Sequence, residues 1–142
     1  MDRRWRAAIG DRIYGCDDCQ TVCPPTVRFA TKHQAPGSDV EPWVSLIEIL
    51  DADDAEVLRR WGRWYVADRD PRWVRRNAIV ALGNVGRSDD VDVRRCLTQY
   101  LAHADPMLRA HAVWAARRLR LDALLPDHDI DPLVVDELAA TL

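Results

Sequence analysis

The chain has 142 residues, of which 48% are hydrophobic and 30% charged, and its net charge is −3. This length can bury one real hydrophobic core, and the composition is that of an ordinary globular protein. No stretch reaches the roughly 18 apolar residues of a membrane span, and the basic N-terminus lacks the apolar core of a signal peptide. We therefore expect no membrane contact and a reducing cytoplasmic setting, in which closely spaced cysteines bind metals.

Three cysteines, Cys16, Cys19 and Cys23, lie within eight residues, and Pro24 follows the last of them. Cysteine runs that end in Cys-Pro are typical of bacterial ferredoxins with two iron–sulfur clusters. A 4Fe–4S cluster usually takes four thiolates, so this run is one ligand short. Prolines and a glycine also punctuate residues 16–42. The pattern predicts a loop-rich, partial ferredoxin-like iron–sulfur segment over residues 1–42.

A structural zinc site is the second interpretation of the same residues. Cys16, Cys19, Cys23 and His33 together would make a Cys₃His set, which Zn²⁺ accepts. The protein would then be a non-catalytic interaction module with a structural zinc. Cys96 is different, because it falls on the apolar face of a predicted helix, where a free cysteine packs like a small hydrophobic residue.

From Trp43 onward the pattern becomes helical. Trp43, Leu46, Ile47 and Leu50 have the i, i+3, i+4, i+7 spacing of one helix face. Asp51, Asp53 and Asp54 break this helix and offer caps for the next. The apolar side of that next helix is formed by Val57, Leu58, Trp61, Trp64 and Tyr65.

A repeat follows these helices. The segment that starts at Asp70-Pro71 is similar to the one that starts at Asp105-Pro106, with an offset of 34 to 35 residues. In each copy the aspartate suits a helix N-cap and the proline suits the first helical position. Helix pairs of this period stack into an α-solenoid, and the pattern is similar to HEAT repeats. We predict an all-α, HEAT-like α-solenoid over residues 43–142.

Basic residues recur along the helices, and they are 19 arginines against one lysine. Arg75 and Arg109 hold matching repeat positions, where we expect ion pairs with aspartates of neighbouring repeats. His111 aligns with Asn77, so the two can share a face, but the favoured interpretation of His111 is a satisfied surface or core histidine. A solenoid can align cations into a stripe along a phosphate backbone. The residues predicted to bind RNA are Arg59, Arg60, Arg63, Arg76 and Asn77.

Two segments resemble one known family. Residues 10–24 closely resemble the second cluster motif of epoxyqueuosine reductase, and residues 75–84 resemble the start of that family's C-terminal HEAT-like domain. The family is an iron–sulfur and cobalamin-dependent oxidoreductase that performs the last step of queuosine formation in tRNA. The resemblance implies that Cys16 and Cys19 hold one cluster with ligands from elsewhere, and that Cys23 reaches the other cluster. It also implies electron delivery and tRNA docking.

The sequence departs from the family in three ways. The catalytic domain that binds cobalamin and the modified base is not represented, nor is the first cluster motif. Pro25 and Thr26 replace a Trp-Asn pair that is common after the second motif. The resemblance therefore implies a C-terminal portion, as a gene fragment, a relic, or half of a split enzyme whose catalytic domain is separately encoded. We expect no epoxyqueuosine reduction by this chain alone.

Overall fold

The computed structural model describes residues 1–16, 18–32, 43–64 and 67–141, and this part of the chain is helical, without strands. Its α-helices are α1 (Arg3–Ile9), α2 (Asp18–Thr21), α3 (Pro24–Lys32), α4 (Leu46–Asp51), α5 (Asp54–Trp61), α6 (Pro71–Val85), α7 (Val91–Leu101), α8 (Pro106–Arg118) and α9 (Pro132–Ala139). Two 3₁₀ turns, η1 (Ala67–Arg69) and η2 (Asp122–Leu124), precede α6 and follow α8. None of the described helices is long and apolar enough to cross a membrane.

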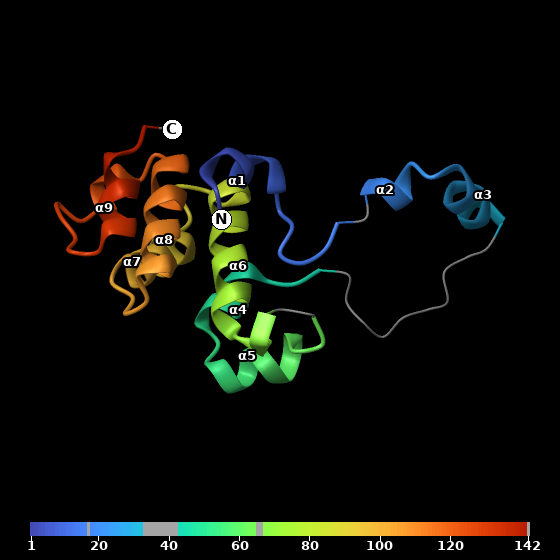
Figure 1. Ribbon diagram of the computed structural model, residues 1–142, viewed down its shortest axis with the longest axis horizontal. Coiled ribbons are helices and arrows are strands. Elements are labelled where there is room, and N and C mark those ends of the chain that lie inside the picture. The colour runs from blue at the N-terminus through green and yellow to red at the C-terminus, as the bar shows by residue number, and fades with distance from the viewer. Residues whose placement is uncertain (17, 33–42, 65–66, 142) are drawn as a thin grey trace.

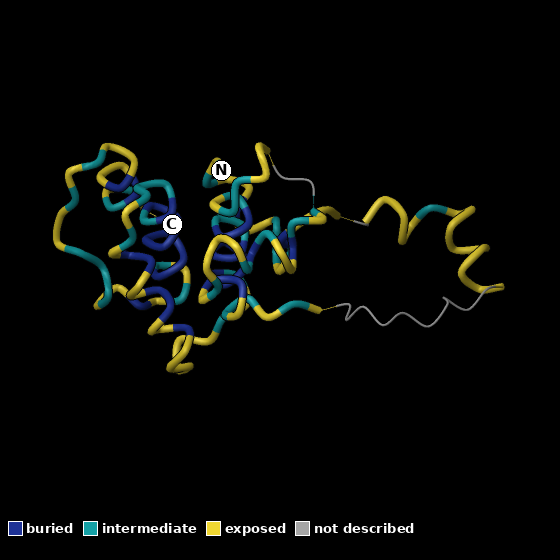
Figure 2. The backbone as a smooth tube through the Cα atoms, turned by 90° about the horizontal axis from the view of Figure 1, so that it is seen from below, coloured by how far each residue is buried: buried dark blue, intermediate teal, exposed yellow. Residues whose placement is uncertain are grey.

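Helices α6 and α8 form the centre of the molecule (Figure 1). They pack against each other, α4 packs on α6, and α7 and α9 pack on α8. Helix α1 lies on α6, whereas α2 and α3 lie apart from the other helices in both views (Figures 1 and 2). The buried positions gather in α6, α7 and α8, and the residues of α2 and α3 are exposed (Figure 2). The predicted helical solenoid is confirmed.

The same Asp-Pro start recurs at three helices. The side chains of Asp70, Asp105 and Asp131 accept hydrogen bonds from backbone N–H groups in the first turns of α6, α8 and α9. A proline follows each aspartate at the first helical position, where its missing N–H costs nothing. Each Asp-Pro pair of the sequence repeat thus marks the first residues of a helix. It also extends to α9, which the two-copy comparison did not include.

Small residues let α6 and α8 approach closely. A Cβ atom added to Gly83 would lie 2.8 Å from the Cα of Ala115 and 2.9 Å from the Trp114 ring. Ala78 and Ala112, at matching repeat positions, are both fully buried. The alanine-rich pattern of the repeats therefore has the expected consequence, a close helix crossing.

The matching arginines of the two repeats form the expected ion pairs. Arg75 bonds the carboxylate of Asp54 and also donates to the carbonyl of Ala52 at 2.7 Å. Arg109 donates two hydrogen bonds to Asp129, at 2.8 and 3.0 Å. Both guanidinium groups therefore join their helices to a neighbouring segment.

Two sequence predictions need correction. The helix predicted from Trp43 begins at Leu46, because Ser45 caps it by accepting a hydrogen bond from the N–H of Glu48. Trp43 therefore lies outside the helix and is 78% exposed. The segment that follows Cys16 is also less loop-like than predicted, because it includes α2 and α3.

The N-terminal residues belong to the helical body. Ile13 is part of the same hydrophobic core as the repeat helices, and α1 contacts α6. The predicted domain boundary at residue 42 lies outside the described residues, as does Tyr65. Within the described part, residues 1–13 pack as one unit with the solenoid.

Candidate functional site

The three clustered cysteines occupy the segment between α1 and α3. Cys16 and Cys19 are exposed, and Cys23 is half-buried just before α3. Across residues 1–16, 18–32, 43–64 and 67–141, no three His, Cys, Asp or Glu side chains are grouped closely enough to hold a metal ion. His33, the fourth ligand of the zinc interpretation, lies outside the described residues.

The fourth cysteine cannot complete the ligand set. Cys96 is fully buried in α7, and burial raises the pKa of its thiol to about 12. A metal ligand must be a thiolate, which such a site disfavours. The described residues therefore do not by themselves fit a complete iron–sulfur or zinc site. Any cluster held by Cys16, Cys19 and Cys23 would need further ligands.

Two asparagines of α6 fix the segment that leads to the cysteines. Asn77 donates to the carbonyl of Ile13 at 2.7 Å, and Asn84 donates to the carbonyls of Arg6 and Gly10 at 2.8 and 3.0 Å. They are seven residues apart, so they share one face of the helix. The sequence pattern favoured RNA binding for Asn77 and gave no role to Asn84, although the seven-residue spacing of the two asparagines is visible in the sequence. The repeat helix thus determines where the cysteine segment leaves the body.

A cavity of about 340 Å³ lies beside Cys16. Arg12 and Asp18 on its wall are joined by hydrogen bonds of 2.7 and 2.8 Å, and these bonds hold the pKa of Asp18 below its ordinary value. Arg76 also lines the cavity and donates to the side-chain oxygen of Asn77 at 3.0 and 2.8 Å. Burial lowers the pKa of Arg76, and we find no carboxylate partner for it among the described residues.

The five predicted RNA-binding residues do not form one cluster. Arg59 bonds Glu56 on α5, and Arg60 bonds Glu48 on α4 at 2.7 Å. Arg76 and Asn77 line the cavity beside Cys16. Arg63 lines a different cavity. Their role in RNA binding stays a prediction.

That second cavity, of about 430 Å³, is rich in aromatic residues and shares Ile13 and Tyr14 with the cavity beside Cys16. The rings of Tyr14 and Trp64 are stacked, with centroids 5.8 Å apart and planes inclined by 6°. Trp43 and Arg63 also line it. The apolar spacing placed Trp43 and Trp64 on helix faces, so the sequence did not predict this site.

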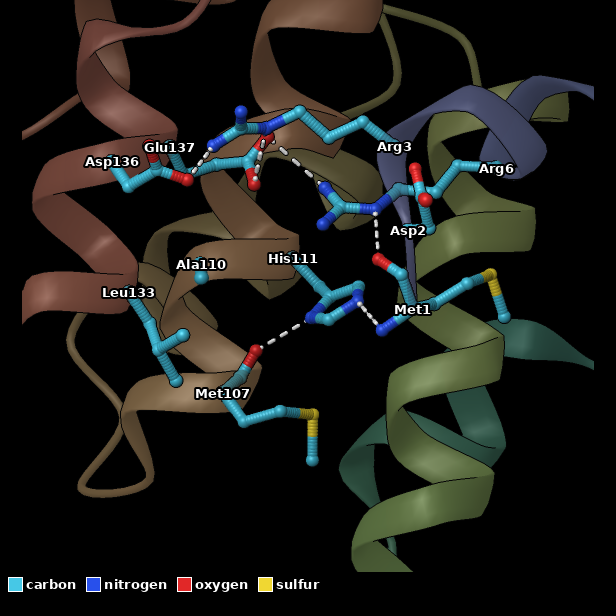
Figure 3. Close-up of a pocket in the computed structure, with 10 residues that line it drawn as sticks. All are labelled: Met1, Asp2, Arg3, Arg6, Met107, Ala110, His111, Leu133, Asp136 and Glu137. Atoms are coloured by element: carbon cyan, nitrogen blue, oxygen red, sulfur yellow. Dashed lines mark hydrogen bonds and ion pairs between the residues drawn. The ribbon is translucent and has the colours of Figure 1, made fainter.

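The helix face that includes His111 meets α1 at a third cavity, of about 350 Å³ (Figure 3). The Nδ1 atom of His111 donates to the carbonyl of Met107 at 2.7 Å, so neutral Nε2 can accept from the amino group of Met1 at 3.3 Å. Arg3 and Arg6 reach Glu137 across the same cavity. His111 is thus a buried histidine with both ring nitrogens bonded, and both it and Asn77 contact residues of the N-terminal segment.

His111 should make stability depend on pH. Burial, with the charges of Arg6, the Met1 amino group and Arg76 as smaller causes, lowers its pKa from 6.5 to about 3. The unfolded chain therefore binds the proton more readily, and stability present above about pH 6.5 is lost as the pH falls toward 3. We expect the free energy of unfolding to fall by about 1.4 kcal/mol per pH unit between about pH 6 and 4.5.

Urea titrations at a series of pH values would measure this slope. His111→Leu should flatten it, and His128→Gln, which alters an exposed histidine, should leave it unchanged. Equal slopes in the wild type and His111→Leu would contradict the assignment to His111.

The sequence and the fold of this chain are similar to those of known proteins. Residues 63–139 match the profile of HEAT repeats. Epoxyqueuosine reductase of Bacillus subtilis is 31% identical over 143 residues, covering 97% of this chain and 33% of that protein. The structure of epoxyqueuosine reductase from Streptococcus thermophilus gives a TM-score of 0.76 at 25% identity, covering 96% of this chain and 38% of that one.

A further solved structure is a crystal structure of epoxyqueuosine reductase with a tRNA-Tyr epoxyqueuosine-modified stem loop. It gives a TM-score of 0.71 at 26% identity, again covering 96% of this chain and 38% of that one. The chain therefore spans about a third of the length of the curated relatives that it matches. The similarity runs through both the cysteine segment and the repeat helices, since 97% of the chain is covered.

Proposed function

The chain belongs to the HEAT-repeat family, and on that premise we propose that it is the iron–sulfur-binding and tRNA-docking C-terminal portion of an epoxyqueuosine reductase-like protein. One observation carries the proposal. The similarity to epoxyqueuosine reductases includes the cysteine segment, and Asn77 of the first repeat helix bonds the residues just before it. The two parts thus belong to one unit.

In this proposal Cys16, Cys19 and Cys23 supply part of the ligand set of a 4Fe–4S centre. Thiolates are the usual ligands of such clusters. Cys16 and Cys19 are exposed, so a partner could reach them. The other ligands come from outside the described residues, as the incomplete local set requires.

Cobalamin and the modified base belong, in this proposal, to the part of the relatives that this chain does not match. The chain spans about a third of those relatives, so the reductase activity is proposed only for an assembly that also includes a catalytic domain beyond these residues. The residues of this chain contribute cluster ligands and a helical platform. The tRNA stem loop bound by one structural relative supports RNA as the partner of that platform.

Anaerobic reconstitution tests the metal part of the proposal. With iron and sulfide supplied, we expect the purified chain to bind both at less than one cluster per chain, to turn brown, and to lose the colour in air, because its ligand set is incomplete. The measurements are the absorbance spectrum and the iron and sulfide content.

Two variants control this experiment. Cys19→Ser should abolish the colour, whereas Cys96→Ala should keep it, because Cys96 is buried in α7 away from solvent. Stable binding of one zinc ion with no affinity for iron would overturn the iron–sulfur proposal and favour the interaction module.

A further inference from the structure

We infer that the aromatic cavity between the Ile13–Tyr14 segment and α4 binds one unpaired nucleotide of an RNA. The cavity measures about 430 Å³, and its lining includes Asp11, Ile13, Tyr14, Trp43, Arg63 and Trp64. Its volume is in the range of small-molecule sites. The inference rests on the proposed tRNA docking and names the group that this surface would hold.

The aromatic rings suit a base. Tyr14 and Trp64 already form a parallel stack, with ring planes inclined by only 6°. Trp43 lines the same cavity, and 78% of its surface is exposed. An exposed tryptophan beside a parallel ring stack offers a face for one more flat ring. Bases of single-stranded RNA bind in this way, and each has such a face.

The charged side chains at the cavity suit the phosphate and the base amino groups of a nucleotide. Arg63 is exposed, and none of the ion pairs found in the described part of the chain involves it. The neighbouring arginines differ, because Glu56 and Glu48 hold Arg59 and Arg60. An unpaired guanidinium beside an aromatic wall can bind phosphate while the base stacks. Asp11 is exposed on the same wall and can accept hydrogen bonds from base amino groups.

The position of the cavity agrees with an RNA partner. Ile13 and Tyr14 line both this cavity and the one beside Cys16, where Arg76 has no carboxylate partner among the described residues. One strand of RNA that spans both cavities would thus meet Arg76 at one and Arg63 at the other. The net charge of −3 means that such an attraction is local rather than global.

Binding of two RNAs tests the inference. The probes are an RNA hairpin with an unpaired loop and a blunt duplex of the same stem, each with a fluorescent label, measured by anisotropy at about 50 mM salt, where phosphate contacts are strong. We expect the whole chain to bind the hairpin more tightly than the duplex. Trp43→Ala should weaken hairpin binding by about fivefold or more and leave duplex binding unchanged.

Two matched variants make the result specific. Trp5 is exposed but lies outside the cavity, so Trp5→Ala should bind both RNAs like the wild type. Arg63→Ala should weaken binding and reduce the salt slope by about one, whereas Arg59→Ala should do less, because Glu56 already neutralises Arg59. Trp43 is largely exposed, so its removal should leave thermal unfolding unchanged, which circular dichroism would verify.

The outcomes separate the two proposals. If the wild type binds neither RNA, the proposed tRNA docking fails and this inference fails with it. If the wild type binds the hairpin and Trp43→Ala binds equally well, or if Trp5→Ala loses as much, the docking stands and the nucleotide site is overturned.

Discussion

Replacing Gly83 with leucine should destabilise the protein by about 3 kcal/mol, the upper part of the range for overpacked cores. The reason is the closeness of α6 and α8. A Cβ at position 83 would lie 2.8 Å from the Cα of Ala115, a backbone atom that cannot turn aside, and 2.9 Å from the Trp114 ring. The helices would have to separate, and the core that they share would loosen. Urea unfolding followed by circular dichroism measures the loss.

A neighbouring position provides the control. Val85 lies on the same helix and is 52% exposed, so Val85→Leu adds a leucine there with an expected change within about 0.5 kcal/mol. A Gly83→Leu protein as stable as Val85→Leu would show that α6 and α8 do not meet at Gly83.

Removing one side of the buried ion pair between α1 and α9 should have an effect of similar size. Arg6 and Glu137 are each only 4% exposed, and their charged atoms lie 3.0 Å apart. Glu137→Leu would leave the guanidinium of Arg6 buried without its carboxylate, and the expected loss is about 3–5 kcal/mol. Thermal and urea unfolding would both record it.

The double variant separates charge from packing. Arg6→Met combined with Glu137→Leu removes both charges, and most of the lost stability should return. The exposed pair Arg87–Asp89 is the control, since Asp89→Ala should leave the free energy of unfolding nearly unchanged. If the double variant were less stable than Glu137→Leu, Arg6 would be stabilising through contacts other than this pair.

The repeat helices could be predicted from the sequence because their determinants are local. An aspartate before a proline caps a helix wherever it occurs, and α6 and α8 begin where this pair predicts. The ion pair of Arg75 was also predictable, because its position recurs in the second copy as Arg109. The start of α4 was predicted wrongly. Apolar spacing extended the helix to Trp43, but the cap at Ser45 begins it later.

The surroundings of the cysteines could not be predicted in the same way. Asn84 bonds carbonyls that lie 74 and 78 residues earlier in the chain, and no periodicity in the sequence reveals such a partner. The aromatic cavity likewise combines Tyr14, Trp43 and Trp64, which come from three separate segments. Ligand chemistry could be read from residue types and spacing, whereas the grouping of distant residues depends on the fold.

The placement of α1 affects how the solenoid comes apart. A stack of repeats whose members touch only their neighbours can fray one repeat at a time from an end. Here α1 touches three of the helices, through Asn84 of α6, the Trp114 ring of α8 and Glu137 of α9. Helix α9 therefore cannot unfold separately without breaking its contacts with α1. These contacts of α1 should make thermal unfolding all-or-none. The cysteine segment would then lose its hydrogen bonds to α6 only when the whole solenoid unfolds.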